Sequence, residues 1–516
     1  MIFQTYLRPV GLLLCLGLSF ACGEETDDTL YDLVIRNGWV HDGTGAPPYY
    51  GQLLINGEKI AKIDRDTARM YRATKVIDAN GKVVSPGFID SHAHGDPLKT
   101  PEFKNFLAMG VTTIFLGQDG SSPNTPAIRP WMDTVDRLHP GVNIGMSVGH
   151  GTLRMISGVA YDRQPTEEGL SRMESLLADA LEEGCFGLST GLEYNPGYLA
   201  GEVELRRLAQ VVGKKGGMIM SHVRNEDDDQ IESSLQELLA QGEYCPVHVS
   251  HIKIVYAKGS DRARDILSIL NRARAAGMKV SADLYPYEAS YTGIGLLFPE
   301  WAKPPATYET VVRERKSELE EHLRNRVNAR NGPEATLLGS GPYKGKTLAE
   351  VAEELRKPFE RVLVEDIGPS GASAAYFVMD ETVMKEFLKD DYVNVCSDGS
   401  PTSNHPRGHG TFAKIIEAYV VKDTLLSLPQ AIHKMTALAA SNLGIRDRGQ
   451  IKVGYFADLL VFDPTKVKAN ASYEEAAQLA SGFDWVVING RVAKEAEEFT
   501  SPGQGRILRK SVPTEK

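Results

Sequence analysis

The stretch Gly87-Phe88-Ile89-Asp90-Ser91-His92-Ala93-His94 decides how the chain folds and where its chemistry lies. It reads as an apolar strand that ends in a His-x-His pair. Side chains two residues apart on a strand point to the same side, so His92 and His94 face one direction. Imidazole is the commonest metal ligand among side chains, and two on one face can bind a single ion. The stretch therefore predicts a metal-dependent hydrolase with further ligands on other strands.

Length and charge limit the remaining function classes. The chain has 516 residues, which is enough for one large domain and a smaller one. Lys and Arg number 57 against 68 for Asp and Glu, and the net charge is −11. Since no basic tract interrupts this acidic balance, we expect no nucleic-acid partner.

The N-terminus has the features of an export signal. Arg8 supplies a positive charge, Gly11–Phe20 is an apolar run, and Ala21 stands directly before Cys22. The apolar run is too short for a helix that spans a bilayer. A small residue before Cys, followed by a polar segment, resembles a bacterial lipoprotein signal, which implies a lipid on Cys22.

This resemblance predicts a signal peptide over residues 1–21 and a linker over 22–30. Ser19 stands where such signals usually have Leu, so an ordinary cleaved signal peptide is the alternative. Either signal predicts an exported protein. The lipoprotein signal predicts a periplasmic protein or one anchored to the outer membrane, with membrane contact only through its lipid.

Both ends of the remaining chain are rich in short strands. Residues 31–84 and 450–510 contain apolar runs separated by turns, including the hairpin signals Asn56-Gly57 and Asn489-Gly490. We therefore expect one small β-sandwich domain built from both termini.

The middle, residues 85–449, alternates apolar strands with helical patterns such as 168–182, 202–214 and 260–276. Eight strands with helical crossovers predict an α/β fold, a (β/α)8 barrel of the TIM type. An open doubly wound sheet has the same pattern and is the alternative. The strand candidates are Val84–His94, Val111–Leu116, Val142–His150, Phe186–Thr190, Met218–Val223, Pro246–Lys253, Val280–Tyr287 and Val393–Asp398.

The segment of about 288–392, between the seventh and eighth strands, is longer than a simple crossover. It contains the helical patterns 308–328 and 348–355 between turns rich in Gly and Pro. We expect an insertion that forms a lid or a substrate wall over the barrel mouth.

Polar side chains at the strand ends locate the site, because barrel enzymes place their chemistry at the carboxyl ends of the strands. Each such residue alone is most often a hydrogen-bonded structural group, and this is the alternative for His150. Convergence by chance is a poor explanation for five of them together, which are His92, His94, His222, His251 and Asp398. Asp119 also follows the end of a predicted strand.

Neutral imidazoles and carboxylates suit Zn²⁺ and similar divalent ions. Such an ion acidifies water for attack on a substrate. A carboxylate beside it can move the proton from the water to the leaving group, and Asp398 is the best-placed candidate.

In this order, these residues resemble the amidohydrolase superfamily and, within it, the D-aminoacylases, which are N-acyl-D-amino-acid deacylases. The resemblance covers nearly the whole mature chain. Besides the opening stretch it rests on Val148–Arg154, Phe186–Leu192, Ser250–Lys253, Asp283–Tyr287, Ser397–Gly399 and His405–Arg407.

The resemblance implies a metal site with one tight zinc and a second, weaker position. The tight zinc would be held by His222, His251 and a strand-two Cys, which is Asp119 here. A carboxylate can ligate or bridge metals, although it lacks the softness of a thiolate; the alternative is a turn residue at this position. His92 and His94 would help to form the weaker position, and Asp398 would be the catalytic acid and base.

The resemblance also implies a substrate with a free carboxylate. Lys253, Tyr285 and Arg407 match the residues that hold the carboxylate of the D-amino acid, and Arg and Lys suit such a group chemically. A family Ser in the strand-seven loop aligns with Tyr291, or with Ser290 if the loop shifts by one. We also count His150 as a substrate-binding candidate, with a purely structural hydrogen bond as the alternative.

We therefore expect metal-dependent hydrolysis of N-acyl-D-amino acids to a carboxylic acid and a D-amino acid. A dipeptidase that cleaves dipeptides with a C-terminal D-amino acid is the nearest rival. A cyclic-amide hydrolase or deaminase is a weaker one, and a lipoprotein that binds without catalysis is a rival of another class.

Overall fold

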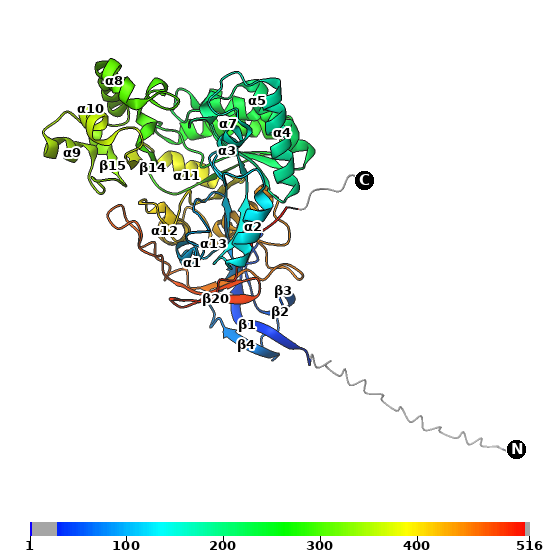
Figure 1. Ribbon diagram of the computed structural model, residues 1–516. Coiled ribbons are helices and arrows are strands. Elements are labelled where there is room, and N and C mark those ends of the chain that lie inside the picture. The colour runs from blue at the N-terminus through cyan, green and yellow to red at the C-terminus, as the bar shows by residue number, and fades with distance from the viewer. Residues whose placement is uncertain (3–27, 511–516) are drawn as a thin grey trace.

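Eight parallel strands close into a barrel in the computed structural model, which describes residues 1–2 and 28–510 (Figure 1). Hydrogen bonds join the strands in the order β6-β7-β8 and β9-β10-β11-β12-β13-β17. Asp398 N donates to His92 O (2.8 Å) and His94 N donates to Gly399 O (2.8 Å), which joins the last strand to the first. This closure confirms the predicted (β/α)8 barrel and excludes an open sheet. The eight barrel positions are filled by nine segments, because β8 and β9, separated only by Ser147, together form the third strand. The segments are β6 (Phe88–Asp90), β7 (Val111–Leu116), β8 (Asn143–Met146), β9 (Val148–Gly149), β10 (Gly187–Gly191), β11 (Met218–His222), β12 (Val247–Val249), β13 (Val280–Leu284) and β17 (Val393–Val395).

The first predicted strand is wrong in its extent. Residues 84–94 do not form one strand, because β5 (Val83–Pro86) belongs to the β domain and β6 begins the barrel after Gly87. A Cβ atom at Gly87 would lie 2.2 Å from the Thr112 Oγ1 atom, so only glycine fits where the chain crosses between the sheets. His92 and His94 follow β6 rather than lie on it, with ring centroids 5.2 Å apart.

The barrel helices form where helical patterns separate the strands, and their apolar faces bury a continuous core against the sheet. Helices α4, α5 and α7 agree with the predicted segments to within one residue. Within residues 28–510, no helix combines the length and apolar character needed to cross a membrane. The helices are α1 (Lys104–Ala108), α2 (Ile128–Arg137), α3 (His150–Ser157), α4 (Glu167–Glu182), α5 (Glu202–Lys214), α6 (Ile231–Gln241), α7 (Ser260–Ala275), α11 (Glu381–Lys389), α12 (Arg407–Lys414), α13 (Leu428–Met435) and α14 (Ala437–Leu443), with short helical turns η1 (Gly197–Leu199) and η6 (Ile415–Lys422).

Both ends of the described chain form the small β domain. Its nine strands make one hydrogen-bonded sheet in the order β21-β20-β19-β18-β5-β1-β2-β3, with β4 against β1. Strands from both halves share one apolar core, so the sheet folds over itself as a sandwich does. The two Asn-Gly pairs join β2 to β3 and β19 to β20. The strands are β1 (Leu30–Val40), β2 (Tyr49–Asn56), β3 (Lys59–Asp64), β4 (Arg72–Asp78), β5, β18 (Leu459–Phe462), β19 (Phe483–Ile488), β20 (Arg491–Glu495) and β21 (Glu498–Phe499).

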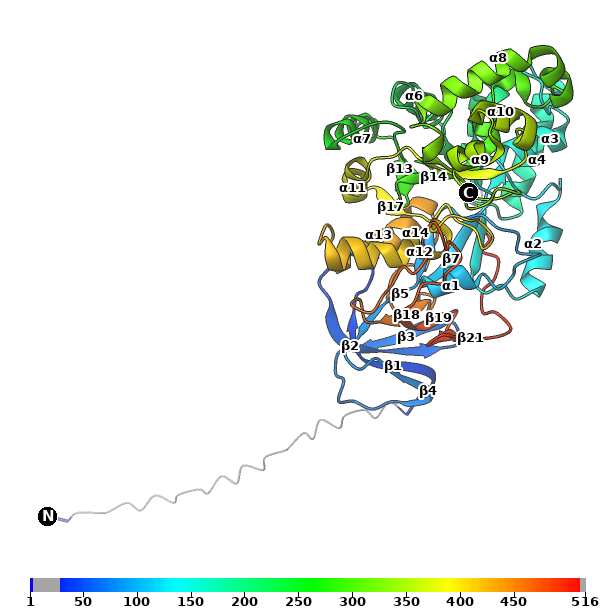
Figure 2. The same ribbon diagram turned by 90° about the vertical axis from the view of Figure 1, so that its left-hand side faces the viewer.

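The insertion after β13 lies at the end of the molecule opposite β1 and β4, as both views show (Figures 1 and 2). Its strands β14, β16 and β15 pair antiparallel, and its helices share a core separate from that of the barrel. Helix α11 packs on α7 and returns the chain to the barrel. The elements are β14 (Ala289–Gly293), η2 (Ile294–Leu297), η3 (Glu300–Ala302), α8 (Tyr308–Ala329), η4 (Pro333–Ala335), β15 (Thr336–Leu338), α9 (Leu348–Leu355), α10 (Phe359–Val362), η5 (Leu363–Ile367) and β16 (Ser373–Phe377).

Candidate metal centre

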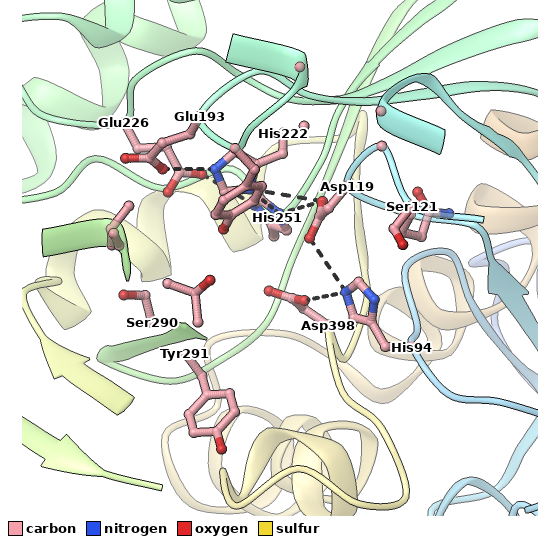
Figure 3. A pocket seen from close by; sticks show the side chains of 18 of the residues that line it. His94, Asp119, Ser121, Glu193, His222, Glu226, His251, Ser290, Tyr291 and Asp398 are labelled. Carbon is pink, nitrogen blue, oxygen red and sulfur yellow. Dashed lines mark hydrogen bonds and ion pairs between the residues drawn. The ribbon is translucent and has the colours of Figure 1, made fainter. Parts of the chain in front are cut away.

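Asp119, in the loop after β7, lies at the centre of the predicted site (Figure 3). Its Oδ1 atom is 3.3 Å from His92 Nε2 and 3.3 Å from His251 Nε2. Its Oδ2 atom is 3.4 Å from His94 Nε2. One carboxylate therefore faces imidazoles from opposite sides of the barrel, which is the arrangement a bridging ligand requires.

Two groups of candidate ligands share this carboxylate. The first is completed by Asp398, whose Oδ1 atom is 3.1 Å from His94 Nε2. The second is completed by His222, whose Nδ1 atom is 3.1 Å from His251 Nε2. Within each group the donor atoms lie within 4.8 Å of one another, close enough to surround one ion. The groups are His92, His94, Asp119 and Asp398, and Asp119, His222 and His251.

The backbone holds three of these residues in the left-handed region. The φ angles are 52° at Asp119, 37° at His251 and 49° at Asp398. Such conformations are unfavourable for residues with a Cβ and concentrate at functional sites, where neighbouring groups enforce them. At His251 the neighbour is Asp283 on β13, whose Oδ1 atom accepts a hydrogen bond from His251 N (2.5 Å).

The site attracts positive charge. Burial lowers the pKa of His94, but hydrogen bonds to Asp119 and Asp398 outweigh burial and raise that pKa to about 9. Burial raises the pKa of Asp119, yet the neighbouring His92 and His251 hold it well below the ordinary value. The carboxylates of Asp119 and Asp398 therefore stay ionised beside His94, which takes up a proton to balance them.

These residues fit a divalent ion. His92 is fully buried, and its Nε2 atom faces only the carboxylates of Asp119 (3.3 Å) and Asp398 (3.7 Å). A buried imidazole nitrogen that is directed at two carboxylates is arranged as a ligand of a shared cation would be. Imidazole and carboxylate donors also match the preferences of zinc.

A cavity of about 620 Å³ opens beside the ligand groups. Lys253, Tyr285 and Arg407 line it, and the Tyr285 ring lies near both cations: 5.7 Å from Lys253 Nζ and 4.7 Å from the Arg407 guanidinium carbon. The Tyr285 hydroxyl, the Arg407 Nε atom and the Ser290 hydroxyl are buried without hydrogen-bond partners. Side chains of Lys, Tyr and Arg in one cavity wall suit a carboxylate of the substrate.

The structure separates the two candidates for the serine of the strand-seven loop. The Tyr291 hydroxyl is 2.6 Å from the Ser373 hydroxyl, and its ring points away from the ligand groups (Figure 3). Ser290 has an unpartnered hydroxyl in the cavity wall. The geometry therefore favours Ser290 over Tyr291 for contact with substrate.

His150 does not line the cavity, which argues against the predicted contact with substrate. It is fully buried at the start of α3, and its Nε2 atom lies 2.7 Å from Glu204 on α5. Arg154 pairs with the same carboxylate through its Nη1 atom (2.5 Å). Because a helix begins immediately after β9, the imidazole is turned toward α5 instead of the barrel mouth. His150 is therefore better described as a structural residue held by a hydrogen bond than as a residue that binds substrate.

Sequence reasoning missed two carboxylates in the cavity wall, Glu193 and Glu226. Glu193 Oε2 lies 2.9 Å from His222 Nε2, and Glu226 Oε1 lies 2.6 Å from Lys253 Nζ. Burial raises the pKa of Glu226, but Lys253 and the neighbouring His222 and His251 together outweigh burial and hold that pKa below its usual value. Glu193 and Glu226 lie within four residues of the ends of β10 and β11. A search of the first loop residues after each predicted strand would therefore have found both.

The family assignment follows from this site together with the sequence comparison. A model described as the amidohydrolase family matches residues 75–358 and 360–493. The chain belongs to the amidohydrolase family. The match includes every residue of the two ligand groups, so the geometry above lies inside the shared part of the chain.

Characterised relatives cover nearly the same length. An N-acyl-D-glutamate deacylase of Alcaligenes xylosoxydans xylosoxydans is 33% identical over 93% of this chain and 96% of its own. A D-aminoacylase of the same organism is 31% identical over 94% of this chain and 99% of its own. These family members are hydrolases of linear amides.

Solved structures agree in fold. The N-acyl-D-glutamate deacylase of Bordetella bronchiseptica, complexed with zinc and a phosphonate that mimics the tetrahedral intermediate, superposes with a TM-score of 0.80 at 31% identity. The match covers 93% of this chain and the whole chain of the Bordetella deacylase. A D-aminoacylase described as having a binuclear metal centre gives a TM-score of 0.81 at 30% identity over the same shares. The predicted architecture and family are thereby confirmed.

Proposed function

We propose that this protein is a zinc-dependent N-acyl-D-amino-acid deacylase, which hydrolyses the amide bond to release a carboxylic acid and a D-amino acid. The observation that carries the proposal is the arrangement around Asp119. Two groups of candidate metal ligands share this carboxylate, and they border a cavity that Lys253, Tyr285 and Arg407 also line. The relatives supply the preference for the D configuration.

The residues that would hold zinc are His222, His251 and Asp119 for the tighter position, and His92 and His94, with Asp119 and Asp398, for the weaker one. Zinc bound there would supply Lewis-acid chemistry, which acidifies water and polarises the amide carbonyl. Because all these side chains except His94 are largely buried, few waters compete with the substrate for the site.

Asp398 is placed to move the proton. Burial raises its pKa, but Arg407 and His251 outweigh burial and hold the pKa below the ordinary range, so the carboxylate can accept a proton. Arg407 Nη1 holds the Oδ2 atom at 2.8 Å, which leaves Oδ1 facing the ligand groups. Asp398 would take the proton of the attacking water and pass it to the leaving nitrogen.

Lys253, Tyr285 and Arg407 would hold the substrate carboxylate. We expect Tyr285→Phe to lower kcat/KM for an N-acyl-D-amino acid by about 10- to 100-fold, because one hydrogen bond to a charged group is lost. The loss should lie mainly in KM, since the hydroxyl binds a part of the substrate that does not react. Steady-state kinetics measure this split; an unchanged KM would place the substrate carboxylate elsewhere.

A dipeptidase acting on dipeptides with a C-terminal D-amino acid is the second candidate. The carboxylate of Glu226 in the cavity wall favours it, because it could receive the free amino group of such a substrate. Parallel assays of N-acetyl-D-amino acids and L-Ala-D-Xaa dipeptides decide between the two. A deacylase hydrolyses the acetylated compounds faster, whereas the reverse order would establish the dipeptidase.

We also infer that the protein is exported and held at the membrane by a lipid on Cys22, which lies outside the described residues. The feature that supports this inference is the order of the N-terminal residues, in which the apolar run Gly11–Phe20 is followed by Ala21 directly before Cys22.

Lipidation is tested by Cys22→Ala. In cells fed radioactive palmitate we expect label in the wild-type protein and none in the variant, and the variant should shift from the membrane fraction to the soluble periplasmic fraction. Equal label and equal membrane association in both proteins would rule out this anchor.

A further inference from the structure

The loop that follows β10 brings an unassigned carboxylate against one of the candidate ligands. Leu192 N donates to His222 O (3.1 Å), so the loop is fastened to the end of β11. The Tyr194 ring packs on the His222 ring, with centroids 4.6 Å apart. Between these two contacts, Glu193 Oε2 reaches His222 Nε2 at 2.9 Å (Figure 3).

This contact decides which nitrogen of His222 faces the metal position. An ionised carboxylate only accepts hydrogen bonds, so the nitrogen beside Glu193 is the one that carries the proton. The other nitrogen, Nδ1, then presents its lone pair toward His251 Nε2 (3.1 Å) and Asp119 Oδ1 (3.9 Å). A carboxylate behind a ligating imidazole fixes the ring orientation and makes the ligand more basic.

The two ligand groups differ in whether a side chain behind each imidazole fixes its orientation. His92, in the group with Asp398, has its Nε2 atom 3.3 Å from Asp119 Oδ1, but its Nδ1 atom has no hydrogen-bond partner. His251, in the group with His222, has its Nδ1 atom 3.3 Å from Glu226 Oε1, a carboxylate that can accept the proton of Nδ1 and leave Nε2 free to ligate. Both imidazoles of the second group are therefore fixed from behind by side chains of the cavity wall.

We propose that Glu193 is a positioning residue that orients His222 and makes the group of Asp119, His222 and His251 the tighter metal position. The inference rests on the proposed zinc dependence and concerns a residue outside the two ligand groups that share Asp119, although the Glu193 carboxylate also lies within 4.8 Å of donor atoms of His222 and Glu226. Glu193 acts through His222 and does not itself touch the ion or the reacting atoms.

The test is the zinc affinity of Glu193→Gln and Glu193→Ala, measured without substrate by competition with a chromophoric chelator. The dissociation constant of the first zinc should rise by about 10-fold in the Gln variant, whose amide oxygen can still accept, and by up to about 100-fold in the Ala variant. The number of zinc ions bound at saturation should stay the same. At saturating zinc, kcat of the Gln variant should remain within several-fold of wild type, while activity at limiting zinc falls.

Glu202→Gln is the matched control, because this side chain is 81% exposed at the start of α5 and contacts no candidate ligand. Its zinc affinity should equal that of wild type. Wild-type affinity in both Glu193 variants would overturn the proposal, and loss of a whole zinc equivalent would also overturn it by making Glu193 a direct ligand. Failure of the proposed deacylase function would appear as absence of substrate hydrolysis. It is distinguishable from failure of this inference, because zinc affinity is measured without any substrate.

Discussion

Asp398→Asn is expected to lower kcat by about 10²- to 10⁴-fold while the protein still binds zinc, because an amide cannot take the proton of the attacking water. The tighter ligand group does not include Asp398, so the first zinc should bind with unchanged affinity. Neutralising the carboxylate also leaves the buried Arg407 without its ion-pair partner, and some loss of thermal stability should accompany the substitution. Stopped assays at saturating substrate, with zinc determined on the same sample, measure both quantities.

Asp391→Asn is the control for this substitution. The residue is exposed, seven positions earlier in the chain, and outside the cavity wall. Its kcat should match wild type. If Asp398→Asn turned over substrate at the wild-type rate, the assignment of the proton transfer to this carboxylate would be refuted.

Removal of zinc by a chelator is expected to abolish activity, and added zinc should restore it. Asp119→Ala should bind little zinc and stay inactive after zinc is added, because this carboxylate faces both ligand groups. Removing it leaves imidazoles alone around the tighter position, one ligand short of the three that a catalytic zinc site normally uses. Zinc content by atomic emission and activity after reconstitution test this directly.

Asp119→Cys is the informative companion variant. A thiolate is a good zinc ligand, so this variant should retain zinc beside His222 and His251. A thiolate offers one donor atom in place of two oxygens, so zinc at the position beside His92 and His94 should be weakened. Full activity and full zinc content in Asp119→Ala would show that Asp119 is only a turn residue.

Much of the barrel was predictable because each strand and helix carries its own pattern. The helical patterns of α5 and α9 match the observed bounds, since amphipathic spacing is a local property of the sequence. The division of residues 84–94 between two sheets was not predictable from that run, because both pieces are apolar and only the long-range pairing of β5 with β18 separates them. The pairing of β14 with β16 likewise joins segments about 80 residues apart.

The ligand groups were predictable because the carboxyl ends of barrel strands meet at one rim. His222 and His251 end their strands or directly follow them, and their side chains meet at Asp119 as that rule requires. His150 also directly follows a strand in the sequence. Because α3 begins at His150 itself, the imidazole points toward Glu204 instead of the barrel rim. The roles of Glu193 and Glu226 depend on loop conformation, which no periodic pattern encodes.

The most direct test of zinc-dependent deacylation is the hydrolysis of matched N-acetyl-D- and N-acetyl-L-amino acids by the zinc-loaded and the metal-free protein. The account predicts release of acetate and a free amino acid from at least one D compound, only with zinc bound, and at a rate far above that for its L partner. Failure of the zinc-loaded protein to hydrolyse any D compound in a panel of acidic, apolar and basic side chains would contradict it.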